Sequence, residues 1–237
     1  MNVVSIMAHQ DDEMRCLGTM LKCRARGDGL AFVTVTDGSG GFVHQPDVKR
    51  ADAARIRHDE MSALAKSIDA QFINLAELDE FLYDTPELRI RLIEAMRATR
   101  ADVIFTHWNQ DYNTDHTTTY ELVKQCALQS HLPMIRTASP TLAQHPAIFC
   151  VEPHGPIPFP PSHFVDVGEF EDEKVRLLNL HRSQNAAFEA FSGEASPLEK
   201  MSRRHDGYWG EQCGCEFAEA FAPMPTRGAI KPYPVLP

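Results

Sequence analysis

Short apolar runs alternate with amphipathic stretches along the first 130 residues. Four runs have the length and composition of buried strands: Asn2–Met7, Leu30–Thr36, Gln71–Leu75 and Asp102–Thr106. After each run the apolar spacing changes to three or four residues, which predicts helices from Asp11 to Gly27, over about Ala51–Ile68, from Pro86 through Met96 and over Asp115–Leu128. This alternation favours the α/β class, a Rossmann-like, mostly parallel β-sheet flanked by helices on both faces.

Prolines become frequent after Ser130, and the regular alternation of strands and helices ends there. The elements expected beyond it are strands at Ala147–Val151 and Phe164–Val167, and helices over Glu169–Ala187 and about His205–Phe221. The tail at Lys231–Pro237 is expected to be extended or packed along a neighbour. We predict a single domain over 1–237 with a Rossmann-like core at 1–130. Residues 131–237 are expected to form a loop-rich, proline-rich lid region with a late strand and C-terminal helices.

The composition narrows the classes of function. Lys and Arg number 23 against 33 Asp and Glu, and the net charge of −10 argues against binding to nucleic acid or to an anionic membrane surface. No apolar run is long enough to span a bilayer and the first residues lack the features of a signal peptide, so we expect a soluble, cytoplasmic protein. The six cysteines are scattered and are expected to be reduced and mostly buried. Whether copies of the chain form a homo-oligomer is left open.

Polar side chains gather after two of the predicted strands. The first strand is followed by Ala8–Glu13, which holds an imidazole and adjacent carboxylates, and the fourth by the polar run His107–His116. In a parallel α/β sheet, ligands bind beyond the carboxyl ends of the strands. We therefore expect the two runs to face one crevice.

These two runs contain the donor set of a catalytic metal site. Zinc binds histidine nitrogen and carboxylate oxygen, and a catalytic site uses three protein ligands and leaves a position for water. His9, Asp12 and His116 fit that set, with one zinc ion per chain. Asp11 is then the candidate general base that takes the proton of the attacking water. The same acidic run is also favoured at a helix start without a metal, because carboxylates cap the helix and complement its dipole.

The hexapeptide Ala8–Glu13, AHQDDE, closely resembles the AHPDDE signature of the PIG-L/LmbE-like zinc-dependent N-acetyl deacetylases. Further elements of that family recur in order along most of the chain: T-D-G at Thr36–Gly38, R-x-x-E at Arg57–Glu60, Asp79 after the third strand, D-H at Asp115–His116, H-x-S-Q at His181–Gln184 and A-E-A-F at Ala218–Phe221. The resemblance implies zinc ligation by His9, Asp12 and His116, with Asp11 as the base. It also implies the family's fold and its reaction, hydrolysis of an N-acetyl amide on an amino sugar or similar small metabolite.

Two positions depart from the family's pattern. Gln10 stands in place of the usual proline, which loosens the turn. Asn113 stands where many members carry a histidine that stabilises the oxyanion or protonates the leaving amine. An asparagine can donate a hydrogen bond to the oxyanion but has no proton to deliver. The acid must then be another group, and we predict His181, ahead of His107 or a protonated Asp11.

Each remaining candidate has a structural interpretation beside the functional one. Arg57 is expected either to contact substrate or to form a salt bridge that shapes the site, and Asp37 either to hold a substrate hydroxyl or to cap the glycine-rich turn. Trp108 and Tyr112 are candidates for a stacking wall against a sugar ring, or for core packing. Asp115 is expected to accept a proton from a ligand imidazole or to cap its helix.

Three functions compete on these observations. The leading hypothesis is a zinc-dependent hydrolase that removes an N-acetyl, or other amide-linked acyl, group from an N-acylated small molecule, namely an amino sugar or a sugar-bearing metabolite. A metal-dependent hydratase on the same scaffold is the second, which Asn113 keeps open. The third is a non-catalytic Rossmann-like module that binds a small molecule. It is disfavoured because the turn after the first strand lacks the G-x-G-x-x-G pattern.

Overall fold

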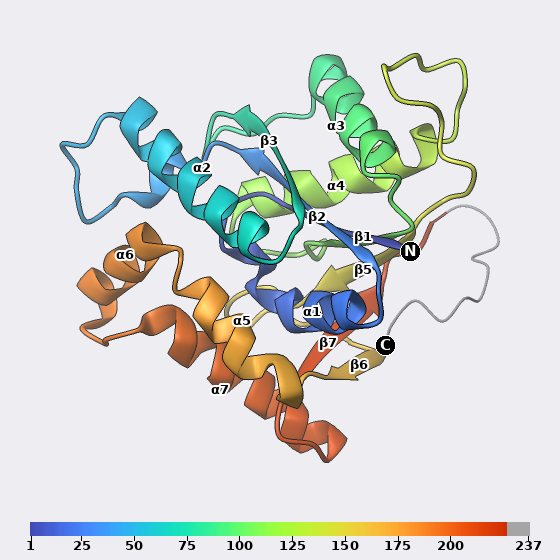
Figure 1. The fold of residues 1–237 in the computed structure, drawn as a ribbon. Helices are drawn as coiled ribbons and strands as arrows, with labels where there is room; N and C mark the ends of the chain where they lie inside the picture. Colours follow the sequence, from blue (N-terminus) through green and yellow to red (C-terminus); the bar gives the residue numbers. More distant parts are fainter. Residues whose placement is uncertain (227–237) are drawn as a thin grey trace.

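A single seven-stranded sheet organises the computed structural model, which describes residues 1–226 (Figure 1). The strands are β1 (Asn2–Met7), β2 (Gly29–Thr36), β3 (Gln71–Glu77), β4 (Val103–Thr106), β5 (Ala147–Val151), β6 (His163–Asp166) and β7 (Ala218–Pro223). Their order across the sheet is β3-β2-β1-β4-β5-β7-β6. Strands β1 to β5 run parallel, while β7 is antiparallel to both β5 and β6. The predicted mostly parallel α/β fold is confirmed.

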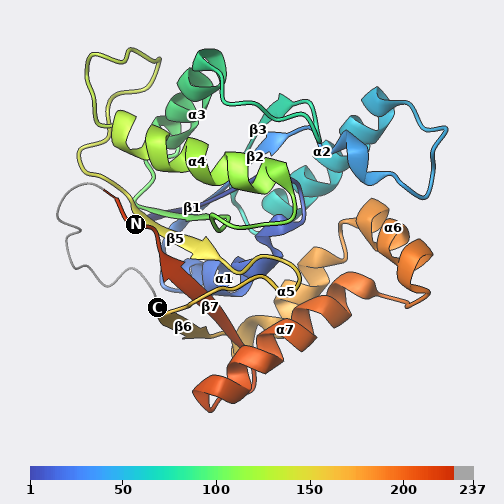
Figure 2. The ribbon, with the colours of Figure 1, turned by 180° about the vertical axis from the view of Figure 1, so that it is seen from behind.

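Helices cover both faces of this sheet (Figures 1 and 2). They are α1 (Leu17–Ala25), α2 (Arg50–Ser67), α3 (Pro86–Ala98), α4 (Thr114–Gln129), α5 (Glu171–Leu178), α6 (Arg182–Ser192) and α7 (Pro197–Cys213). One core lies between the sheet and α1, α2, α5 and α7 and includes Phe32, Met61 and Phe221. The other lies between the sheet and α3 and α4 and includes Val33, Leu92 and Val123. Because both faces are buried, the parallel strands are apolar throughout, which made them recognisable in the sequence.

Beyond residue 130 the prediction needs two corrections. The helix expected over Glu169–Ala187 is two helices, α5 and α6, interrupted at residues 179–181. The helix expected over His205–Phe221 is wrong in its second half, because α7 ends at Cys213 and Ala218–Pro223 form strand β7. Gly214 ends α7 with a φ of 77°, which glycine adopts without strain.

The chain then returns closely against α7 before it enters the sheet. A Cβ on Gly210 would lie 2.5 Å from the carbonyl oxygen of Glu216, so only glycine allows this approach. The small residues of β7, including Ala220 and Ala222, are buried between β5 and β6. The strands past residue 130 thus extend the same sheet. The assignment of 1–237 to a single domain stays a prediction, and the tail predicted at Lys231–Pro237 lies outside the described residues.

A buried ion cluster joins β7 to three helices. Lys174 of α5 is fully buried and contacts the carboxylates of Asp206 on α7 and Glu219 on β7. Glu219 also accepts hydrogen bonds from the backbone N–H groups of Gly18 (2.9 Å) and Thr19 (2.7 Å), in the first turn of α1. Burial raises the pKa of the neighbouring Glu171 to about 7, although Lys174 opposes this shift. The cluster attaches the last strand to the rest of the core.

Within residues 1–226, none of the helices combines the length and apolar character that crossing a bilayer requires.

Candidate active site

A cavity of about 510 Å³ lies at the carboxyl ends of the parallel strands. Its polar side is formed by the turn after β1, by the segment between β4 and α4, and by the loop after β3. Its other side is apolar and includes Phe188 and Phe191 of α6 and Leu198 and Met201 of α7. Of the predicted lid region, residues 131–146 contribute nothing to the lining, whereas His154, Gly155, α6 and α7 do.

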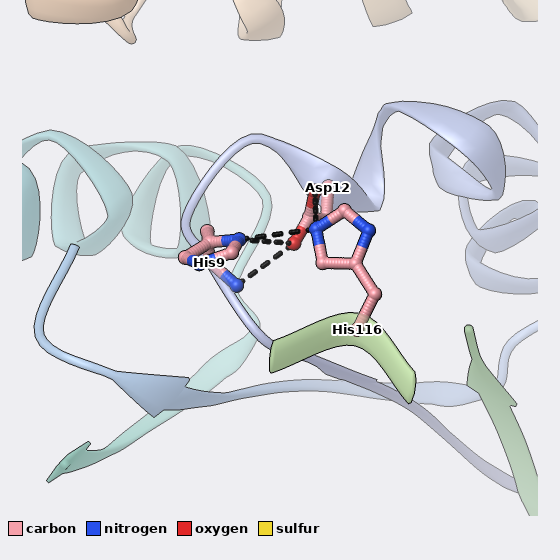
Figure 3. Close-up of side chains that lie close together, drawn as sticks. All are labelled: His9, Asp12 and His116. Carbon is pink, nitrogen blue, oxygen red and sulfur yellow. Dashed lines mark hydrogen bonds and ion pairs between the residues drawn. The ribbon is translucent and has the colours of Figure 1, made fainter. Parts of the chain in front are cut away.

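Three side chains converge in this cavity (Figure 3). His9 and Asp12 come from the turn after β1, and His116 from the first turn of α4. His9 Nδ1 lies 3.2 Å from His116 Nε2 and 3.2 Å from Asp12 Oδ2, and His116 Nε2 lies 3.4 Å from Asp12 Oδ1. Strands β1 and β4 are neighbours, and this adjacency brings together residues that are 107 positions apart.

The outer nitrogens of both histidines face carboxylates. His9 Nε2 lies 2.9 Å from Asp79 Oδ1, and His116 Nδ1 lies 3.0 Å from Asp111 Oδ2. Neutral imidazoles with their protons on these outer nitrogens would direct them at carboxylates, which only accept hydrogen bonds when ionised. The inner nitrogens then direct lone pairs toward each other and toward Asp12. Three lone-pair donors without a hydrogen between them fit a divalent cation.

The charges of this group also favour a cation. Burial opposes ionisation of Asp12, yet His116 and His107 hold the pKa of that carboxyl well below its usual value. Burial likewise opposes protonation of His9, but hydrogen bonds with Asp115, Asp12 and Asp79 raise its pKa well above the ordinary value. Without a metal the ionised Asp12 thus favours a proton on His9, and a bound cation would take the place of that positive charge.

Asp115 lies slightly farther from the ligand histidine than Asp79 does. Its Oδ2 is 3.6 Å from His9 Nε2. The same carboxylate accepts hydrogen bonds from the backbone N–H groups of Glu80 (2.8 Å) and Leu82 (3.2 Å). Asp115 thus holds the loop that carries Asp79, while Asp79 makes the shorter contact with His9.

Replacing Asp79 with asparagine is expected to weaken metal binding about 10–100-fold, because an amide is a poorer acceptor for the His9 N–H. The measurement is competition for zinc against a chelator of known affinity. Asp84→Asn is the matched control, since Asp84 pairs with Arg89 at the surface and lies outside the cavity lining. Equal affinities in the two variants would contradict a role of Asp79 in orienting His9.

Asp11 lies beside the three donors without joining them. Its backbone adopts a left-handed conformation with φ of 109°, which turns the chain sharply between His9 and Asp12. The neighbouring Gln10 is fully buried and donates to the carbonyl oxygen of Thr36. Arg57 Nη2 lies 3.1 Å from Asp11 Oδ1. Burial raises the pKa of Asp11 to about 6, while Arg57 opposes this shift.

Asn113 lines the cavity with a fixed orientation of its amide. Its Oδ1 accepts a hydrogen bond from the backbone N–H of Asp115 (2.7 Å) and so caps α4. The Nδ2 group is therefore the end of the amide that remains for a ligand. The cap explains why a helix-capping residue is found there, and donation to the oxyanion by Asn113 stays a prediction.

The structure brings some of the other candidates to the cavity. Arg57 is buried and lines it, and Tyr112 lines it from an exposed position with its ring 6.1 Å from that of His116. Trp108 does not line the cavity, because its Nε1 donates to the Pro158 carbonyl oxygen (3.2 Å). Asp37 does not line it either, and accepts from the backbone N–H of Ser39 (2.9 Å) as a cap of the glycine-rich turn.

Neither histidine considered as the acid lines the cavity. His181 is fully buried, with Nε2 at 2.7 Å from Glu13 Oε1. His107 stacks on His116 with 4.0 Å between ring centroids, and its Nε2 accepts from the backbone N–H of Ala8 (2.9 Å). Burial, with His116, lowers the pKa of His107 to about 4.

Three residues close to the site received no role from the sequence. Asp111 belongs to the polar run before α4, but its residue type alone does not distinguish this aspartate from Asp115 in the same run. Arg15 and His154 are 139 positions apart, and neither belongs to a recognisable motif. His154 could have been found from its position just beyond the end of strand β5, because ligands bind beyond strand ends in this class of sheet.

Comparisons with known proteins agree with this architecture. The sequence pattern of the family described as PIG-L, GlcNAc-PI de-N-acetylase, matches residues 4–127. The chain is similar to N,N'-diacetylchitobiose deacetylase from Pyrococcus horikoshii, at 23% identity over 94% of this chain and 84% of that chain, with a TM-score of 0.79. It resembles the conserved protein TT1542 from Thermus thermophilus, at 23% identity over 96% of both chains, with a TM-score of 0.77. It also resembles GalB, the 4-carboxy-2-hydroxymuconate hydratase from Pseudomonas putida, at 17% identity over 98% of this chain and 99% of that chain, with a TM-score of 0.79.

Proposed function

The chain belongs to the PIG-L family, and from this premise we propose that it is a zinc-dependent hydrolase. The substrate would be an amino sugar or sugar-bearing small metabolite that loses an N-acetyl, or other amide-linked acyl, group. The convergence of His9 Nδ1, His116 Nε2 and Asp12 beside the carboxylate of Asp11 carries this proposal. The apolar side of the cavity leaves room for the rest of the substrate.

In this proposal His9, Asp12 and His116 hold one zinc ion per chain. When bound, the ion would polarise the acyl carbonyl and lower the pKa of water, which makes both reactants of the hydrolysis more reactive. Asp11 accepts the proton of the attacking water, because its carboxylate lines the cavity and is not among the three donors. The amide Nδ2 of Asn113 donates to oxygen as negative charge develops on it.

The leaving amine then needs a proton as the C–N bond breaks. Asn113 has none to give, and neither His181 nor His107 lines the cavity. We therefore propose that Asp11 returns the proton it took from water, so that one group serves as base and then as acid. Its raised pKa, about 6, suits a carboxyl that must hold a proton for part of the cycle. The products are the free carboxylic acid and the amine.

Elemental analysis of protein purified without chelator is expected to give close to one equivalent of zinc per chain. His116→Ala should lose most of it, because two protein donors remain of three. His163→Ala is the matched control, since His163 lies on β6 outside the cavity. Full metal retention in His116→Ala would remove His116 from the site.

Release of acetate from N-acetylglucosamine and N,N'-diacetylchitobiose tests the reaction itself. We expect acetate and a free amine from at least one N-acylated sugar, with activity lost on chelation and restored by zinc. A zinc-loaded protein that releases acid from no N-acylated compound would contradict the proposal. Protein without bound metal or turnover would instead favour the non-catalytic binding module.

A hydratase is the second candidate. The fold is shared with GalB over nearly the whole of both chains, and Asn113 stands where many members of the family carry a histidine. The two reactions differ in their products, because a hydratase adds water to a carbon–carbon double bond and releases no amine. Loss of the ultraviolet absorbance of a conjugated unsaturated acid, without amine release, would favour it.

A further inference from the structure

His154 lines the cavity from the loop after β5, a part of the chain that supplies none of the three metal-ligand candidates. It is the third residue after β5, which runs parallel to its neighbour β4. The loop that carries His154 therefore lies at the carboxyl ends of the strands, beside the cavity. The side chain is close enough to the donor group that Asp12 and His116 act on its charge. His154 therefore shares the cavity with the candidate metal site.

Arg15 lies behind His154 and is itself buried, with 8% of its surface exposed. It belongs to the short 3-10 helix Asp12–Arg15, three residues after a candidate ligand. Its Nη2 lies 3.0 Å from His154 Nδ1. Its Nε and Nη1 have no hydrogen-bond partner among residues 1–226, so His154 is the group that this guanidinium bonds.

This contact determines which ring nitrogen of His154 carries the proton. A guanidinium group can only donate hydrogen bonds and does not lose its proton in proteins. Nδ1 of His154 must therefore accept, and the proton of the neutral ring is on Nε2. Nε2 makes no hydrogen bond with any of the residues that the structure describes. His154, which lines the cavity, thus keeps an Nε2–H donor without a partner among the described residues.

The surroundings also keep the ring neutral. A protonated His154 would place two cations in contact at a partly buried position. Burial and then the Arg15 charge lower the pKa of His154 to about 3. A neutral imidazole fixed in one tautomer is a suitable hydrogen-bond donor toward an oxygen that becomes negative, because its orientation needs no change during the reaction.

We propose that His154 is a catalytic residue whose Nε2–H donates a hydrogen bond to the carbonyl oxygen of the substrate and stabilises the negative charge that develops there. The proposal rests on the hydrolase function proposed above. No proton is transferred, because the neutral ring keeps its Nε2 proton while Arg15 occupies Nδ1. His154 and Asn113 together would then supply two fixed donors from separate elements of the fold, one from the loop after β5 and one from the start of α4.

Two substitutions separate the donor from the bulk of the side chain. The amide nitrogen of His154→Gln reaches roughly the position of Nε2, whereas the shorter His154→Asn places its amide near Nδ1. Loss of one such donor lowers kcat about 10²–10³-fold. We expect that loss for His154→Asn. The kcat of His154→Gln should be at least about tenfold higher than that of His154→Asn, with zinc content unchanged in both variants. Equal kcat values for the wild type and His154→Asn would overturn the proposal. Equal losses of kcat in His154→Gln and His154→Asn would overturn it as well.

The tautomer can be measured without turnover. Histidine-selective ¹⁵N labelling of the zinc-loaded protein distinguishes Nδ1–H, Nε2–H and the doubly protonated ring, and the spectrum of His154→Gln identifies the signal that belongs to His154. We expect the Nε2–H form at pH 7, and a shift of its Nε2 resonance when acetate, a product of the proposed reaction, is added. An Nδ1–H or charged ring would overturn the proposal. If wild type releases no acetate while the Nε2–H form is found, the hydrolase function fails and the tautomer assignment stands.

Discussion

Replacing Asp11 with asparagine is expected to lower kcat by about 10²–10⁴-fold while zinc stays bound at one equivalent, because an amide cannot accept the proton of the attacking water. The substitution suits the backbone, since asparagine is among the few residues that tolerate the left-handed conformation found at Asp11. Steady-state kinetics on the zinc-loaded variant, with metal content measured on the same sample, is the test.

The neighbouring acid provides the contrast for this experiment. Asp12→Asn should lose much of the zinc as well as the activity, because Asp12 lies 3.2 Å from His9 Nδ1 and 3.4 Å from His116 Nε2. If Asp11→Asn loses zinc to the same extent, Asp11 is a ligand and the proposed division between the two carboxylates is wrong. If it keeps both zinc and full activity, another group is the base.

Replacing Lys174 with methionine is expected to lower the free energy of unfolding by about 3–5 kcal/mol, since removing one partner of a buried ion pair leaves the other charges uncompensated. Lys174 is fully buried, and the variant leaves Asp206 and Glu219 in the core without their cation. Urea unfolding, followed by circular dichroism, measures the change from the midpoint and slope.

Lys200→Met is the matched control for this prediction. Lys200 on α7 pairs with Glu194 at 3.8 Å, and about half of each side chain is exposed to solvent. Exposed pairs of this kind contribute about 0–1 kcal/mol. A loss below about 1 kcal/mol in Lys174→Met as well would contradict the prediction, because the buried carboxylates would then not depend on Lys174 for their stability.

The candidate ligands were predictable because two simple rules act together. Strands such as β1 and β5 were predicted with the bounds that they have, since strands buried on both faces are continuously apolar. The polar residues that follow such strands must then lie at one edge of the sheet. His9, Asp12 and His116 could be grouped in this way before any contact was known.

Other features depend on contacts that leave no periodic pattern in the sequence. The run Ala218–Phe221 was predicted as helix, because alanine and glutamate favour helices where no tertiary contact decides. In the structure Glu219 is buried by Lys174, 45 positions away, and by the first turn of α1, 200 positions away. The tautomer of His154 likewise depends on Arg15, which no local spacing connects to it.

The position of β7 between β5 and β6 has a consequence for synthesis of the chain. Strand β6 is synthesised before β7, yet β6 pairs with no strand other than β7 in the described part of the chain. The backbone N–H groups of Gly18 and Thr19 also lack their acceptor until Glu219 is in place. The nascent polypeptide therefore cannot complete its sheet until residues 218–223 have left the exit tunnel, and until then the backbone groups of β5 that pair with β7 lack that partner strand.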